Sequence, residues 1–164
     1  MMKTMKMKVF VFSMMMLAVL AGCSKDDKND ADLGSGTVTV TINGKKTELS
    51  NLFAGVLDNK VNITATENVQ ELSMMIDGSI DKGTYNYDSN EPTVVPYVIT
   101  YAESNKAVFT TVTNVTKASL TITSHDQAKN KIKGSFTLTY LDNETQEPHQ
   151  ASGSFEVTYT DVMK

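Results

Sequence analysis

The chain contains no arginine and no tryptophan, and only one cysteine and three prolines occur among its 164 residues. Without arginine it lacks the forked side chain that binds phosphates at two points, and its net charge of −4 does not attract polyanions. We therefore expect no nucleic-acid partner. One cysteine cannot form a disulfide within the chain, and it cannot supply a cysteine ligand set for a metal.

The first 22 residues have the layout of a secretory signal peptide. Three lysines lie near the start, and an apolar run follows over residues 9–19. From Val9 to Gly22 there are only 14 residues, whereas a helix needs about 20 to cross the hydrocarbon core of a membrane. We therefore expect residues 1–22 to be cleaved off rather than kept as a membrane span.

The cysteine follows directly on that apolar run. The tetrapeptide Leu20-Ala21-Gly22-Cys23 resembles the lipobox of bacterial lipoproteins, in which the signal is cut before the cysteine. The resemblance implies that Cys23 becomes the N-terminus and carries acyl chains such as palmitate. Each buried CH₂ group contributes about 0.8 kcal/mol, so two or more chains anchor a protein stably to a membrane. Loss of the three signal lysines would change the net charge from −4 to −7.

Residues 23–35 are polar and acidic, with one large apolar residue, and we expect a lipidated cysteine followed by a disordered tether. Their acidic residues do not fall in the register of a calcium-binding loop, which also needs a central glycine and a closing glutamate. Lys25, Asp26 and Asp27 stand just after Cys23. They are similar to the acidic export signal of surface lipoproteins from Bacteroidota-type bacteria, and we predict that they direct the protein to the cell surface.

The remaining residues, 36–164, show the alternation that is typical of β-strands. Apolar residues alternate with threonines over 37–42, and Asn43-Gly44 then predicts a two-residue hairpin turn. Similar short runs separated by turn residues continue to the C-terminus. We predict an all-β domain, either a single antiparallel β-sandwich or a flattened up-and-down barrel.

Residues 49–57 are ambiguous, because their apolar residues also fit one face of a helix. The turn residues at 58–59 and the alternating run at 61–65 favour a strand instead, and a strand is our prediction.

The clearest internal order lies near the C-terminus. The pattern Gly-Ser-Phe-x-x-Thr-Tyr occurs twice, at residues 134–140 and 153–159. We predict a meander of three strands, at residues 120–124, 132–140 and 153–159, with one shared buried face. Phe136 and Phe155 lie on that face, and the glycines are expected where a strand bends or bulges.

Three quoted segments carry a resemblance to a known group of proteins. The run SLTITSHDQAKNKIKGSFTLTY, the later GSFEVTYTD and the earlier GTYNY are similar to those of small Bacteroidota-type lipoproteins of unknown function. The resemblance implies a lipid-anchored all-β domain at the outer membrane or cell surface. It implies no activity.

The sequence offers little for catalysis. His125 and His149 are the two candidate bases near neutral pH, and no Gly-x-Ser-x-Gly nucleophile motif is present. We expect both histidines to be solvated loop residues. A metal site made of both histidines and one acid would lack any recognisable ligand spacing. We predict no catalytic residues, no metal and no cofactor.

A sugar-binding site is the more plausible chemistry. Tyr97 and Tyr101, with Tyr85 and Tyr87 upstream, could form an aromatic platform for a sugar ring. The alternative, which we favour, is that these tyrosines pack against a sheet face and leave their hydroxyls at its rim.

We therefore predict a non-enzymatic binding or scaffolding domain, held in the envelope by its lipid, with a glycan or an envelope protein as partner. The second interpretation is a lipocalin-like carrier, because an up-and-down barrel can hold one small apolar molecule. An enzyme is the third.

Overall fold

The computed structural model describes residues 34–91 and 94–161, and within these ranges it contains twelve strands and no helix. The strands are β1 (Ser35–Ile42), β2 (Lys45–Leu49), β3 (Asn51–Leu57), β4 (Lys60–Glu67), β5 (Gln70–Asp77), β6 (Gly83–Asp88), β7 (Tyr97–Glu103), β8 (Lys106–Thr110), β9 (Val115–Asp126), β10 (Lys131–Leu141), β11 (Pro148–Thr158) and β12 (Thr160–Asp161).

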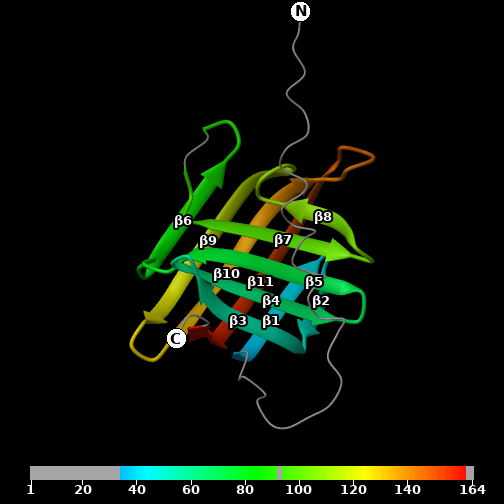
Figure 1. The fold of residues 1–164 in the computed structure, drawn as a ribbon. Coiled ribbons are helices and arrows are strands. Elements are labelled where there is room, and N and C mark those ends of the chain that lie inside the picture. Colours follow the sequence, from blue (N-terminus) through cyan, green and yellow to red (C-terminus); the bar gives the residue numbers. More distant parts are fainter. Residues whose placement is uncertain (1–33, 92–93, 162–164) are drawn as a thin grey trace, which may run out of the picture. The chain divides into compact units, whose positions relative to one another are not determined.

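The strands form two open six-stranded sheets. Sheet 1 has the order β2-β1-β11-β10-β9-β6, and sheet 2 has the order β12-β3-β4-β5-β7-β8. Figure 1 shows the strands of one sheet running across those of the other. Neighbours are antiparallel, except that the short β12 pairs in parallel with β3. This confirms the all-β prediction and its sandwich alternative, whereas the barrel alternative is wrong because the sheets do not close on each other.

Two of the predicted turns have the expected backbone conformation. Asn43 and Gly44 have φ angles of 50° and 77°, and they join β1 to β2. Asp58 and Asn59 have φ angles of 51° and 57°, and they join β3 to β4. Both pairs therefore supply the two positive φ angles that a tight hairpin turn needs.

The ambiguous residues 49–57 form the end of β2 and the whole of β3, as predicted. Ser50 alone separates these strands, so the chain passes from sheet 1 to sheet 2 there. Pairing with β4 along its whole length gives β3 the backbone hydrogen bonds that a helix would otherwise supply.

Several predicted boundaries are wrong by a few residues. The strand predicted at 120–124 is the longer β9, which begins at Val115 and ends at Asp126. Ser35 was placed in the tether, but it belongs to β1 and pairs with Thr158 of β11. The third meander strand begins at Pro148 rather than Gly153. Pro148 is the first residue of its strand, where the missing N–H of proline is tolerated.

The core lies between the two sheets. Along β10 the residues alternate strictly between buried and outward positions from Lys131 to Leu138. Twenty-seven hydrophobic residues of the described ranges are buried, and the largest fully buried side chains are Tyr101, Phe109, Phe136, Phe155, Ile63, Leu72, Met74, Ile76, Ile99, Leu120, Ile122 and Ile132. The space between the sheets is therefore occupied by the protein's own side chains.

The two copies of the Gly-Ser-Phe pattern pair with each other. Gly134 lies opposite Phe155, and Gly153 lies opposite Phe136. A Cβ at Gly134 would stand 2.7 Å from the Phe155 ring, and one at Gly153 would stand 2.5 Å from the Phe136 ring. Each glycine thus leaves the space that the opposite aromatic ring occupies.

Asn114 connects β8, β9 and the end of β10. Its amide nitrogen donates to the carbonyl oxygens of Val108 and Leu141, each at 2.9 Å, and its side-chain oxygen accepts from the N–H of Thr110. The side chain therefore links the edge of sheet 2 to sheet 1 through backbone groups of both.

The inward position of the two phenylalanines generates a stability prediction. Changing Phe136 or Phe155 to Ala should lower the free energy of unfolding by about 3–5 kcal/mol, because each ring is 2% exposed. Thr137→Ala is the matched control on the outward face of the same strand, and it should change stability by about 0.5 kcal/mol or less. Urea unfolding midpoints measure all three. A Thr137 variant that is less stable than either phenylalanine variant would contradict the observed facing.

Candidate binding face

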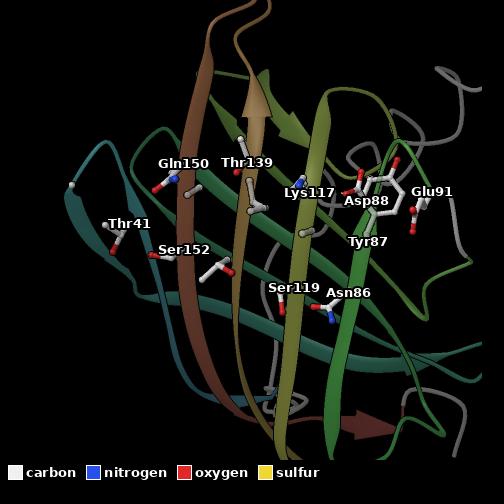
Figure 2. Close-up of a pocket in the computed structure, with 15 residues that line it drawn as sticks. Thr41, Asn86, Tyr87, Asp88, Glu91, Lys117, Ser119, Thr139, Gln150 and Ser152 are labelled. Atoms are coloured by element: carbon white, nitrogen blue, oxygen red, sulfur yellow. Dashed lines mark ion pairs between the residues drawn. The ribbon is translucent and has the colours of Figure 1, made fainter.

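The outer face of sheet 1 contains an open hollow with a volume of about 770 Å³. The residues labelled in Figure 2 line it, and they come from β1, β11, β10, β9 and β6 and from Glu91 just after β6. Its volume lies within the range of about 300–1,000 Å³ that is usual for ligand pockets. The hollow is therefore the feature of the described structure that best fits a binding site.

One continuous row of polar side chains crosses this hollow. Thr41 of β1 pairs with Ser152 of β11, which pairs with Thr137 of β10. Thr137 pairs with Ser119 of β9, and Ser119 pairs with Asn86 of β6. We call these five residues the central row. The strand register places these five residues side by side. Each also occupies an outward position of its strand, so their side chains share the outer face.

The side chains of the central row make no hydrogen bonds within the described ranges. The neighbouring row behaves differently. In it Thr39 is hydrogen-bonded to Ser154 at 2.9 Å, and Thr84 is hydrogen-bonded to Thr121 at 3.0 Å. The central row therefore keeps its donors and acceptors for molecules outside the protein, whereas most of the next row is satisfied internally.

Strand β9 contains two bulges. Thr116 and Thr123 are extra residues that have no partner in the β9–β10 pairing. Their hydroxyls donate to the carbonyl oxygens of Thr139 at 3.2 Å and Lys133 at 3.1 Å. A bulge bends its strand and increases its twist, so the two bulges curve β9 along the hollow.

Charged groups lie at one end of the hollow. Lys117 Nζ is 3.5 Å from an Asp88 carboxylate oxygen, and Glu91 lies beyond β6 (Figure 2). The backbone N–H of Asn90 donates to Asp88 at 2.9 Å, and this bond, helped by Lys117, holds the pKa of that carboxyl below its usual value. Asp88 is therefore ionised at neutral pH.

A smaller hollow of about 400 Å³ lies near the opposite end of the same face. Lys133 and Glu156 form an ion pair of 2.8 Å across β10 and β11 there. The hydrogen bond from Lys133 lowers the pKa of the Glu156 carboxyl. Because this pair is mutually satisfied and exposed, we assign the larger hollow, and not this one, as the candidate site.

The structure does not place Tyr97 and Tyr101 where a sugar platform would need them. They are 3% and 1% exposed, so their rings lie in the core and cannot receive a sugar ring. Their hydroxyls reach polar partners: Tyr97 donates to the carbonyl of Tyr85 at 3.2 Å, and Tyr101 donates to Glu103 at 2.6 Å. Burial raises the pKa of Tyr97 to about 12 and also raises that of Tyr101. The sequence-based ligand site is thus corrected to the packing alternative.

His125 is not a solvated loop residue. It lies in β9, where its Nδ1 is 2.9 Å from the carbonyl oxygen of Ile80 and its Nε2 is 2.9 Å from the hydroxyl of Tyr159. A carbonyl oxygen only accepts, so Nδ1 carries the proton and, in the neutral ring, Nε2 accepts from Tyr159. His125 therefore holds a loop and a strand end together.

His149 lies in β11, and its ring stacks on that of Tyr140 at 5.6 Å between centroids. His149 pairs with Tyr140, whereas His125 pairs with Ile132, eight residues away along the same strand. Eight residues of extended chain span about 27 Å, so the two histidines cannot bind one metal ion. Residues 34–91 and 94–161 contain no group of three or more potential metal ligands.

The other sequence-predicted sites lie outside the described residues. These are the signal peptide at 1–22, the lipidation site Cys23 and the export signal at Lys25, Asp26 and Asp27. Within the described part of the chain, no helix is long and apolar enough to span a membrane.

The central row was missed by sequence reasoning. The available signal was the concentration of serine and threonine at alternate positions of β1, β9, β10 and β11. That signal shows which face is polar, but the alignment of residues from different strands depends on their register.

The fold places this chain among two-sheet β-sandwich domains. Residues 50–158 match the family described as "Domain of unknown function (DUF6252)", and the chain belongs to that family. The matched region runs from the residue before β3 to the end of β11, so it includes four of the five strands that line the hollow. No curated protein matches this chain.

The charged end of the hollow generates a titration prediction. The pKa of Asp88 should be below the ordinary aspartate value, and in Lys117→Met it should rise but remain below that value, because the N–H of Asn90 still donates. The NMR chemical shift of the Asp88 carboxyl carbon against pH measures this. Lys129→Met is the control, since Lys129 pairs with Asp126 and should leave Asp88 unchanged. A return of Asp88 to its ordinary value in Lys117→Met would show that the ion pair, and not the amide, dominates.

Proposed function

We propose that this protein is a lipid-anchored, non-enzymatic binding domain of the cell envelope, and that it binds its partner in the hollow of sheet 1. The observation that carries the proposal is the central row, whose polar side chains line a hollow and make no hydrogen bonds within the described ranges. Binding sites combine a concave shape with a few converging polar groups, and this face has both.

The packed interior supports binding on the outside rather than between the sheets. Buried hydrophobic side chains fill the space that an apolar ligand would need in a carrier, and both hollows described above lie on the outer face of sheet 1. We therefore favour the binding domain over the lipocalin-like carrier.

The proposal excludes catalysis for a geometric reason. An acid–base or nucleophilic site needs a base aimed at a nucleophile or a substrate proton. Both ring nitrogens of His125 face structural partners, and the ring of His149, which is next to Gln150, stacks on Tyr140. Neither histidine lines the larger hollow.

The anchor part of the proposal rests on the sequence. The lipobox-like Leu20-Ala21-Gly22-Cys23 supports lipidation of Cys23, and the tether up to residue 34 would keep the domain clear of the membrane surface. The acidic residues that follow Cys23 support display at the cell surface, as in Bacteroidota-type lipoproteins. The outer membrane is the proposed location.

The lipidation site is tested by one substitution. Cys23→Ser should abolish incorporation of radiolabelled palmitate and leave an uncleaved precursor or a soluble form, because serine lacks the thiol to which the lipid is attached. Ser24→Ala, at the next residue, is the matched control and should be labelled like the wild type. Equal labelling of the Cys23 variant and the wild type would overturn the lipid anchor.

Surface display is tested separately in intact cells. External protease should remove the wild-type domain. Changing Lys25, Asp26 and Asp27 to Ala should protect it, since the variant keeps Cys23 and the whole β-domain but lacks the charged signal. Changing Asn29 to Ala provides a control within the same tether. A wild-type protein that is digested only after the outer membrane is opened would place it on the inner side.

A further inference from the structure

We propose that the hollow of sheet 1 binds a neutral oligosaccharide chain, which lies across the strands along the central row. This inference rests on the proposed binding function and names the chemical class of its ligand. It moves the sugar-binding role from the two buried tyrosines to the outer face of sheet 1, where the polar side chains are accessible.

The chemistry of the central row matches a polyhydroxylated ligand. A serine or threonine hydroxyl both donates and accepts, and an asparagine amide presents two donors and an acceptor. A sugar hydroxyl likewise donates and accepts. Four hydroxyls and the Asn86 amide stand in this row, and Gln150 adds a second amide beside it. None of these side chains has a hydrogen-bonding partner within the described ranges, so each can bond to the ligand.

The charges of the hollow disfavour an anionic ligand. Lys117 is the one cation among the residues that line it, and its ammonium group is paired with Asp88. Glu91 adds a further negative charge at the same end. A phosphate, sulfate or uronate group would meet this acidic end without an available positive partner. At the other end of the row, Lys46 of β2 pairs with Thr41 but is not among the residues that line the hollow. The charges of the lining therefore favour a neutral ligand.

An apolar ligand is excluded by what the hollow exposes. Its aliphatic lining residues are Ala118, Leu138 and Ala151, and these are 6%, 4% and 4% exposed. Tyr87 is the one aromatic residue of the lining, and its half-buried side chain packs against the core between the sheets.

The dimensions favour a chain over a single sugar. Strands lie about 4.8 Å apart, so the central row, from Thr41 on β1 to Asn86 on β6, extends for about 19 Å. Polar groups therefore repeat at regular steps in one direction across five strands. A repeating ligand with hydroxyls on every unit can engage several of these steps at once.

The test uses the full-length protein purified in detergent, so that it does not depend on whether Cys23 is lipidated. Cellohexaose, mannohexaose and xylohexaose are titrated one at a time and binding is followed by calorimetry, with hexagalacturonate as the anionic counterpart. At least one neutral hexasaccharide should bind. Hexagalacturonate should bind more weakly than that hexasaccharide.

Paired variants locate the binding. Thr41→Val with Thr137→Val removes two hydroxyls of the central row while keeping the β-branched shape, and it should weaken binding about tenfold. Thr39→Val with Thr121→Val removes two hydroxyls of the adjacent row, which are bonded within the protein, and should leave affinity within about twofold. Thermal melting checks that both variants fold.

Each contrary outcome has a distinct meaning. Failure of all three neutral hexasaccharides to bind, tighter binding of hexagalacturonate, or equal weakening by both double variants would overturn the oligosaccharide ligand. A protein partner that the central-row variant releases and the control variant retains would also overturn it, while leaving the proposed binding function intact. Loss of the lipid anchor would contradict the proposed function without affecting this titration.

Discussion

The reciprocal contact between Gly134 and Phe155, and between Gly153 and Phe136, determines how the centre of sheet 1 is built. Each ring fills the space that a side chain on the opposite residue would need, so the two strands fit together in one register only. A slip of one residue would turn the phenylalanine of one of the two strands to the solvent face. The buried area of two large aromatic rings opposes such a slip.

This register also creates the outer face. In a strand, successive side chains point to opposite sides, so the pairing that brings the rings onto the glycines inside brings serines and threonines into line outside. Thr137 and Ser152 lie opposite each other for the same reason that Phe136 lies opposite Gly153. The candidate binding site is thus a consequence of core packing, and the bulges of β9 then curve it.

Residues that resemble catalytic or ligand-binding groups serve the fold here. His125 bonds to Ile80 and Tyr159, and Tyr101 bonds to Glu103, so their polar atoms are satisfied at the borders of the core. No buried side-chain nitrogen or oxygen of residues 34–91 and 94–161 lacks a hydrogen-bond partner. Because unsatisfied polar groups are costly only where water is excluded, the unbonded groups of the central row are tolerated on the open face.

The sequence by itself determined the strand class, the hairpins at Asn43-Gly44 and at residues 58–59, and the three-strand meander, because alternation and turn conformation are local properties. Burial of Tyr97 and the position of the central row were decided only by the tertiary structure. The fold brings together residues that are far apart in sequence. In sheet 1, for example, the side chains of Thr39 and Ser154 are hydrogen-bonded although they are 115 residues apart. Period-two alternation identifies two faces for each strand, but which face meets the other sheet, and which residue lies beside which, depends on the packing of all the strands together.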